Sequence, residues 1–514
     1  MKAQRKAPAV RSALFLCGLI LVCGPNVRAQ TEGSTKTWAA TSIRGVSTER
    51  PAAEWWNSFH DEELTRLIRR AVANNLDLRL AAARVDEARA ARGVAKSAFY
   101  PSVGVTTSAE RLHERVAAFN PGVNAPTFHP VELNNFQVGF DSAWEIDVFG
   151  RIRNEVKAAS ANVRSAEEDR RDVLVVLLGE VARSYADLRG FQLRLEIAEK
   201  NIRTQEDTVH LTQTRAAAGL ATQLDVSRAV AELETTNAVV PSLRSAIAAS
   251  IHRISVLLGQ EPAALEKELE TSAPVPVVPP EVPVGLPSDL LKRRPDVRRA
   301  DDEIAGAAAN VKAARADYFP KFTLLGSAGR QATQLHDLSL SLGNFFAAGP
   351  AISLPIFTGG RIRSNVAVQN ARWKQTQILY QSTVLNSLEE TENALVNYSQ
   401  EQERRNRLQA AVSQNQTALE LSRELYTSGL GDFLAVLDAQ RQLYGNEDLL
   451  AQSQTAVTTN LIALYKALGG GWESFPQQYG LRDTSKLVDC PVRSVLGNAQ
   501  GATNPGLSAS GKLF

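Results

Sequence analysis

The residues of this sequence that could bind a metal or act in catalysis follow no recognised catalytic or metal-binding pattern. The six histidines are scattered, and none forms the helical pair of a zinc protease; they are His60, His113, His129, His210, His252 and His336. Gly359-Gly360 lacks the spacing and the lysine of a phosphate-binding loop. Gly469-Gly470-Gly471 follows a predicted helix and marks its end. We therefore expect no enzyme, no cofactor and no metal site.

The N-terminal segment, residues 1–29, has the pattern of a secretory signal peptide. A basic stretch at residues 2–11 precedes about ten apolar residues, and Val27-Arg28-Ala29 supplies small residues for cleavage, so the mature chain would begin at Gln30. This apolar stretch is too short to span a membrane as a helix. Lipidation of Cys23 is the alternative to cleavage after Ala29. With either processing, Cys490 stays without an intrachain cysteine partner, so no disulfide is expected.

The charge pattern argues against a nucleic-acid partner. The chain has 514 residues and a net charge of +2, and its Lys and Arg residues are spread along the sequence instead of forming one patch. A nucleic-acid-binding surface requires clustered positive charge. We therefore predict no nucleic-acid binding.

The chain is an internal tandem duplication. One set of motifs recurs at an offset of 219, from Phe99-Tyr100-Pro101 to Tyr318-Phe319-Pro320. A second set recurs at an offset of 210, without a gap over a long stretch of the chain. Its pairs are Gly150-Arg151 with Gly360-Arg361, Gly219-Leu220 with Gly429-Leu430, Leu224 with Leu434, and Leu258-Gly259 with Leu468-Gly469. Chance similarity between two helical stretches would not keep one register for so long.

The duplication divides the mature chain into five segments. We predict an N-terminal periplasmic segment at residues 30–60, repeat 1 at 61–270 and repeat 2 at 288–471. A proline-rich stretch at 271–287 reads as an extended connector between the repeats. Residues 472–514 form a C-terminal tail that we expect to be partly disordered.

Each repeat is expected to fold as helix, strand, loop, strand, long helix, turn and helix. Residues 153–218 and 363–428 contain no proline and are rich in helix-forming residues. Helices of this length suggest coiled-coil-like packing. Gly219 and Gly429 would end them in hairpin turns, and returning helices would run to Gly259 and Gly469. The helices taken alone would also suit a soluble coiled-coil rod.

The predicted strands argue against a plain rod. From Phe136 to Asp147 apolar and polar residues alternate, which gives one apolar and one polar face. Outer-membrane strands have this pattern, with lipid on one side and water on the other. Residues 101–109, 321–330 and 345–357 are weaker candidates. Every apolar run in the mature chain is too short for a membrane-spanning helix, so we expect any membrane span to consist of strands.

Four strands cannot close a barrel, and open strand edges are not tolerated in lipid. The chain must therefore share its barrel with other copies. Three copies would give twelve strands, an even number within the known range, and geometry alone also allows two or four copies.

The sequence resembles the outer-membrane efflux protein family, the TolC and NodT type exit ducts of tripartite pumps. The resemblance is carried by FDSAWEIDVFGR at residues 140–151, LLKRRPDVR at 290–298, YTSG at 426–429 and VLDAQR at 436–441. It implies a mixed α/β homotrimer in the cell outer membrane, with a twelve-stranded β-barrel in lipid and a helical barrel spanning the periplasm. It also implies two partners, a periplasmic adaptor protein and an inner-membrane transporter. An adhesin-like or structural coiled-coil envelope protein is the alternative.

The resemblance also implies a periplasmic gate. Leu434 matches an apolar constriction and Asp438 a ring of carboxylates, while Tyr426 matches a residue that helps to hold the gate. Asp225 matches a carboxylate in repeat 1 that ties helices together. Three Asp438 side chains near one axis would repel one another and attract cations. Ordinary helix packing for Leu434 and a solvated helix carboxylate for Asp438 are the alternatives.

Two positions depart from the family pattern. Ala435 stands where some members have a second gate carboxylate, and Gly431 where they have an interhelical arginine. The predicted gate therefore resembles that of the drug-efflux subgroup, which uses a leucine and one aspartate, and no salt bridge is assumed at this place. The sequence does not identify the transported substrate.

Overall fold

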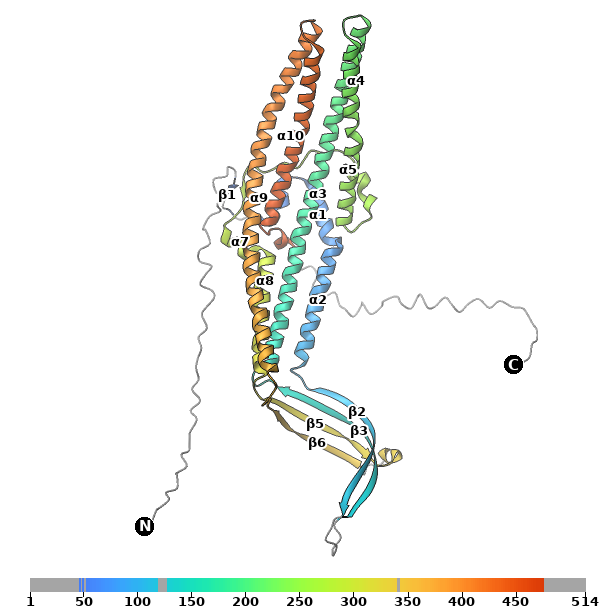
Figure 1. The fold of residues 1–514 in the computed structure, drawn as a ribbon, viewed down its shortest axis with the longest axis vertical. Coiled ribbons are helices and arrows are strands. Elements are labelled where there is room, and N and C mark those ends of the chain that lie inside the picture. Colours follow the sequence, from blue (N-terminus) through green and yellow to red (C-terminus); the bar gives the residue numbers. More distant parts are fainter. Residues whose placement is uncertain (1–45, 48, 50–51, 119–126, 340–342, 476–514) are drawn as a thin grey trace, which may run out of the picture.

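The computed structural model shows a long helical body joined at one end to a four-stranded sheet (Figure 1). The structure describes residues 46–47, 49, 52–118, 127–339 and 343–475, without the side chains of residues 46, 114–118 and 127–129. The predicted cleavage site between Ala29 and Gln30 lies outside the described residues, as do residues 476–514 of the predicted tail.

No described helix combines the length and the apolar character needed to cross a membrane.

The sheet is antiparallel, with strand order β2-β3-β5-β6. Its strands are β2 (Ser102–Ala118), β3 (Thr127–Ile146), β5 (Lys321–Ala332) and β6 (Asn344–Ser353). The β2–β3 hairpin is longer than predicted and extends beyond the other two strands, as Figure 1 shows. The predicted strand at 345–357 ends early, at Ser353, because Ser353 already pairs with Lys321, the first residue of β5.

One face of the sheet is apolar and exposed. On β3, Val138, Phe140, Trp144 and Ile146 point to the same side and are exposed, in agreement with the predicted alternation. Directly paired residues share a face, so the apolar surface continues across the sheet through Val103, Val105, Leu324, Phe346 and Ile352, which are also exposed. A contiguous exposed apolar surface of this kind marks a membrane or protein contact.

Two helices of 67 residues each form the frame of the helical body. They are α3 (Arg151–Ala217) and α9 (Arg361–Thr427), whose first residues, Arg151 and Arg361, are related by the offset of 210. At 1.5 Å per residue each is about 100 Å long. Gly150 and Gly360 precede them with φ of 79° and 84°, a left-handed conformation that favours glycine. The long helices predicted from the absence of proline are thus confirmed.

The helices that return from the hairpin turns differ between the repeats. In repeat 2 the return is one helix, α10 (Phe433–Ala467). In repeat 1 it is broken at Ala238 into α4 (Gln223–Asn237) and α5 (Val239–Leu257). Pro241 explains the break, because its ring clashes with the carbonyl of Asn237 four residues earlier and it has no N–H to donate. The prediction of one unbroken helix was therefore wrong for repeat 1.

Shorter elements complete the body. Helices α1 (Glu62–Asn74) and α2 (Leu76–Ser97) pack on α3, while α7 (Pro287–Arg293) leads into α8 (Pro295–Ala316), which packs on α3 and α9. Strands β1 (Val46–Ser47) and β4 (Val282–Pro283) pair in parallel. The remaining described elements are α6 (Glu266–Leu269) and 3-10 turns at Trp55–Phe59, Pro262–Leu265, Leu335–Ser339 and Trp472–Ser474.

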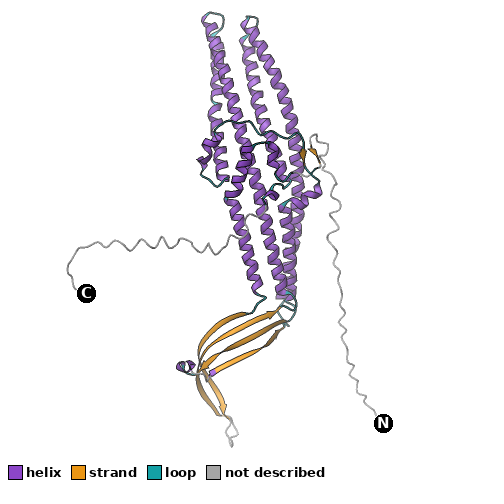
Figure 2. Cartoon of the chain, turned by 180° about the vertical axis from the view of Figure 1, so that it is seen from behind, coloured by secondary structure: helices purple, strands orange, loops and turns teal. Residues whose placement is uncertain are grey.

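The main core is a belt at mid-length, where the connector and the ends of the repeats wrap around the long helices (Figure 2). Trp55 and Trp56 are buried there, and the Trp55 ring stacks on Tyr465 of α10 at 5.2 Å between ring centroids. Gly471 approaches so closely that a Cβ atom would lie 2.6 Å from Leu178 Cδ1 and 3.1 Å from Trp55 Nε1. Its φ of 109° also favours glycine.

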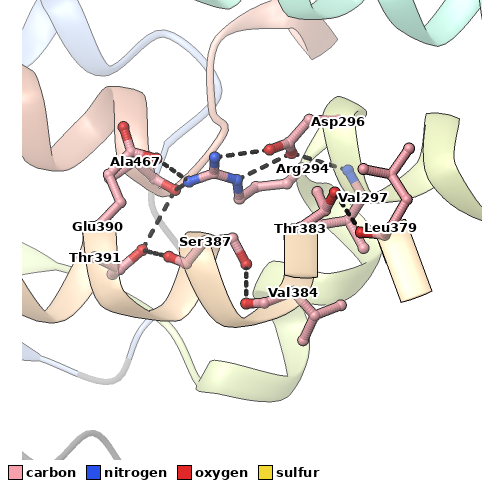
Figure 3. Close-up of polar contacts among 10 residues, drawn as sticks. All are labelled: Arg294, Asp296, Val297, Leu379, Thr383, Val384, Ser387, Glu390, Thr391 and Ala467. Atoms are coloured by element: carbon pink, nitrogen blue, oxygen red, sulfur yellow. Dashed lines mark hydrogen bonds and ion pairs between the residues drawn. The ribbon is translucent and has the colours of Figure 1, made fainter. Parts of the chain in front are cut away.

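Arg294 joins three helices at this belt (Figure 3). It precedes α8 and binds both carboxylate oxygens of Asp296, with Nε–Oδ1 at 3.0 Å and Nη2–Oδ2 at 2.8 Å. Its Nη1 donates to Glu390 Oε2 on α9 at 2.7 Å and to the carbonyl oxygen of Ala467 on α10 at 2.8 Å. Burial lowers the pKa of Arg294, but the two carboxylates outweigh burial and hold its pKa above the usual value.

Repeat 1 makes the same tertiary bond with a neutral residue. Asn75, which corresponds to Arg294 at the offset of 219, donates from Nδ2 to the carbonyl oxygen of Leu257 at 2.9 Å. Leu257 corresponds to Ala467 at the offset of 210. The oxygen of Asn75 accepts from the backbone N–H of Leu78 at 2.9 Å and so caps α2. Both repeats thus fix the last turn of the returning helix, repeat 1 with the neutral amide of Asn75 and repeat 2 with the buried charge of Arg294.

Candidate functional site at the tips of the helix hairpins

Glycines shape both hairpin tips, as predicted. Gly219 and Gly429 have φ of 71° and 77°. Beyond them, the N–H of Leu220 donates to the carbonyl of Arg215 at 2.8 Å, and the N–H of Leu430 donates to that of Leu425 at 2.9 Å. This is the usual glycine-containing end of a helix. A Cβ atom would meet nothing within 4 Å at either glycine, so backbone conformation is the reason for glycine here.

Leu434 and Asp438 lie on one exposed strip of α10. They are one helical turn apart, and both side chains are exposed. The opposite side of α10 is buried through Phe433, Val436 and Leu437. The strip therefore faces away from the core of its own hairpin. Leu220, Leu224 and Leu430 are also exposed, so leucines are concentrated at the tips.

Tyr426 occupies the core between the hairpins instead of the exposed strip. Its side chain is only 6% exposed, and its ring centroid lies 5.5 Å from that of Phe433. Arg215 Cζ of α3 lies 4.6 Å from the ring centroid, a cation–π contact. The buried hydroxyl of Tyr426 has no hydrogen-bond partner among the described residues. Tyr426 thus joins the tips of α3, α9 and α10.

Asp225 is used within the first turn of α4. Its Oδ2 accepts from the Thr222 N–H at 3.0 Å and from the Thr222 hydroxyl at 2.7 Å. In return, the Asp225 N–H donates to Thr222 Oγ1 at 3.2 Å. This is a capping box. The described hydrogen bonds of Asp225 are local, and none of them joins it to Tyr426 or Asp438.

Contacts that the sequence did not single out tie α10 to repeat 1. Arg441 Nε lies 2.6 Å from Glu232 Oε2 on α4, and Gln440 Nε2 donates to Thr208 Oγ1 of α3 at 2.8 Å. Further along, Arg194 of α3 binds both oxygens of Asp448 at 2.7 and 3.2 Å. Gln440 is four residues after the buried Val436. Gln440 is therefore a polar residue on the buried side of α10, and this position in the sequence could have predicted its contact with another helix.

Comparison with known proteins gives the family. A family model described as "Outer membrane efflux protein" matches residues 67–260 and 286–470. The chain belongs to this family. The chain is 32% identical over 455 residues to the toluene efflux pump outer membrane protein TtgC of Pseudomonas putida, covering 87% of this chain and 90% of TtgC. It is 30% identical to the pyoverdine export outer membrane protein OpmQ of Pseudomonas aeruginosa, covering 92% of this chain and 99% of OpmQ.

Solved structures of efflux channels share the fold. The outer-membrane channel OprN matches with a TM-score of 0.80 and 34% identity, covering 88% of this chain and 99% of OprN. The outer membrane protein VceC of Vibrio cholerae matches with a TM-score of 0.73 and 27% identity, covering 82% of this chain and 100% of VceC.

This efflux protein is therefore an outer-membrane channel component that extends into the periplasm, and its function is transport. The family assignment decides against the structural coiled-coil or adhesin-like alternative.

Proposed function

We propose that three copies of this efflux protein form the exit duct of a tripartite efflux system. The observation that carries the proposal is the sheet, which exposes one apolar face and lies at the end of helices about 100 Å long. Its edge strands, β2 and β6, are each paired on one side only in the described chain. Three such sheets would form a closed barrel of twelve strands, which leaves no open edge in lipid.

The helical body also has two free flanks that suit such an assembly. Within one chain the helices next to the sheet lie in the order α2, α3, α8, α9. The outer members, α2 and α9, expose apolar side chains on the lower half of the body; these are Leu76, Leu80, Val94, Val368, Ile378, Leu379 and Leu385. Contact between α9 of one copy and α2 of the next would bury both flanks and close a helical barrel.

The cargo is proposed to be small molecules received from a periplasmic adaptor and an inner-membrane transporter. Two relatives support this class, since one is named for toluene efflux and the other for pyoverdine export. The wall of the duct would come from repeats 61–270 and 288–471, joined by the connector at 271–287.

Leu434 and Asp438 are proposed as the periplasmic gate. Their exposed strip would face the threefold axis, where three leucines narrow the passage and three carboxylates attract cations and repel one another. Tyr426, packed between α3, α9 and α10, would hold the strip in place. Asp225 would support the gate by capping the start of α4. If Asp225 also ties two helices together, the second helix would belong to a neighbouring copy.

The test is expression in a strain that lacks its own efflux channel, together with candidate adaptors and transporters. We expect restored resistance to small toxic molecules, and a trimer band in the outer-membrane fraction that heating converts to monomer. A monomer in the soluble periplasmic fraction would overturn the proposal. Mass spectrometry of the mature N-terminus should give Gln30, and a lipid-modified Cys23 would contradict cleavage after Ala29.

A further inference from the structure

The internal duplication allows the register of the strand pair between neighbouring copies to be worked out. This inference rests on the proposed trimer, in which β6 of one copy meets β2 of the next. In a single chain, three strand pairs are observed: β2–β3, β3–β5 and β5–β6. The fourth pair, which would close the barrel, joins the second strand of repeat 2 to the first strand of repeat 1. Its internal counterpart is β3–β5, which joins the second strand of repeat 1 to the first strand of repeat 2.

The offsets of the sequence repeat hold in the strands. The first strands of the two repeats, β2 and β5, begin at Ser102 and Lys321, which are related by the offset of 219. The second strand of each repeat leads into the Gly-Arg start of a long helix, at Gly150 and Gly360, which are related by the offset of 210. We can therefore transfer any residue pair from one hairpin to the other.

The observed hairpins provide a test of this transfer. In repeat 1, Ser102 pairs with Ala143. The two offsets convert this pair into Lys321 with Ser353, which is the register observed between β5 and β6. Two independently observed ladders thus agree without a shift of even one residue.

Applying the same offsets to β3–β5 gives the missing pair. Ile146 is opposite Phe322 in the structure, and the offsets convert them into Ile356 and Val103. We infer that β6 and its extension pair antiparallel with β2 of the neighbouring copy in this register, so that Ser353 lies opposite Thr106 of that copy. Ala351 then lies opposite Ser108 of the neighbouring copy, and Leu354 opposite Val105.

The side chains at the two edges suit this register. Ile356 is 92% exposed in the single chain, and Leu354, Val103 and Val105 are also exposed. The register places these four apolar side chains together on the apolar face of the sheet. A shift of one residue would turn Ile356 and Leu354 toward the polar face. Pro355 has no N–H to donate, so this end of the strand pair would depend on the side-chain contacts of Leu354 and Ile356 more than on backbone hydrogen bonds.

The register also accounts for the early end of β6. Residues 354–356 correspond to Trp144–Ile146, which are strand in repeat 1 because β5 lies beside them. In repeat 2 the equivalent neighbour belongs to another copy. The sequence pattern that predicts a strand as far as Phe357 therefore has a partner only in the assembly.

Disulfide cross-linking of paired cysteine variants tests the register. The background variant is Cys490→Ser. Two matched pairs are Ser353→Cys with Thr106→Cys, and Ala351→Cys with Ser108→Cys. Two swapped pairs use the same four positions, Ser353→Cys with Ser108→Cys and Ala351→Cys with Thr106→Cys. Swapping displaces the partners by two residues, about 7 Å along the strand, which exceeds the reach of a disulfide.

Mild oxidation of membranes should link the matched pairs between copies at least about fivefold more than the swapped pairs. A bond within one chain is excluded, because β3 and β5 separate β2 from β6 by about 14 Å. Stronger cross-linking of a swapped pair would overturn the register and leave the trimer intact. An unheated trimer band with no cross-link in any variant would overturn the β6–β2 contact. Loss of the trimer band in the background variant itself would instead refute the proposed trimer.

Discussion

Replacing Arg294 with alanine should destabilise the helical body strongly, because it removes one partner of a buried ion pair. The Arg294 side chain is 12% exposed and that of Asp296 is also largely buried, while Glu390 is 48% exposed. Leaving a buried charge without its partner costs about 3–5 kcal/mol. The solvent-screened bond to Glu390 adds little to this. We therefore expect the free energy of unfolding to fall by about 3 kcal/mol.

The matched control is Arg299→Ala in α8, the helix that Arg294 precedes. Arg299 Nη1 lies 3.0 Å from Asp169 Oδ1, a distance similar to those of Arg294, but its side chain is 39% exposed. Such a pair contributes at most about 1 kcal/mol. Arg294→Lys should lose about half of the alanine effect, because an ammonium keeps the charge but cannot bind both oxygens of Asp296 in parallel.

The assay is denaturant unfolding of the purified protein in detergent, followed by its helical circular dichroism. A double-mutant cycle of Arg294→Ala with Asp296→Ala should give a coupling free energy of about 2 kcal/mol. If Arg294→Ala were as mild as Arg299→Ala, or the coupling were near zero, burial would not be the property that makes this arginine important.

Three further predictions concern the gate, the glycines and Glu168. The double variant Leu434→Ala with Asp438→Ala should raise the planar-bilayer conductance of the closed duct. Leu224→Ala, at the equivalent place in repeat 1, should leave the conductance unchanged. If the double variant had the wild-type conductance, Leu434 and Asp438 would not form the gate. Gly471→Ala should lower the free energy of unfolding by about 3 kcal/mol, because backbone strain and a clash with Leu178 add. Gly219→Ala should lower it by about 1 kcal/mol, because only backbone strain acts there. If thermal unfolding ranked the two variants equally, the close packing of Leu178 on Gly471 would not matter for stability. Burial raises the pKa of Glu168 against the opposing charges of Arg171 and Arg298. The folded state thus holds this proton more tightly than the unfolded state, so its stabilising contribution is present at acid pH and is lost as pH rises through the raised pKa. Melting temperatures measured across this range should fall more steeply for the wild type than for Glu168→Gln, and parallel curves would show that Glu168 does not titrate in this way.

The long helices were predictable from local sequence because nothing within them interrupts helix formation. The absence of proline and the terminal glycines placed α3 and α9 within two residues of their observed ends. The same local information was present at Pro241, and it would have predicted the break at Ala238 that the single-helix expectation missed. Local signals therefore account for most of the helical fold.

Features that depend on distant partners could not be predicted in the same way. The end of β6 depends on how far β5 reaches, and the burial of Trp55, which precedes repeat 1, depends on Tyr465, which lies near the end of repeat 2. At the tips, the spacing of Leu434 and Asp438 was enough to place them on one face. The burial of Tyr426 under Arg215 follows from how α3 and α9 pack, which no periodicity contains. Asp225 is different, because the Thr222 to Asp225 spacing was a recognisable capping signal.

The break at Ala238 has a mechanical consequence. A force applied at the Gly429 tip acts on an unbroken rod, α10, about 52 Å long, whose far end is held by Arg294. At the Gly219 tip the returning arm is interrupted about 22 Å away, at the end of α4, while the other arm, α3, is unbroken. In repeat 2 both arms of the hairpin, α9 and α10, are therefore continuous from the tip to the belt, whereas in repeat 1 α3 alone is continuous, so we expect the returning arm of repeat 1 to transmit a displacement less stiffly than α10.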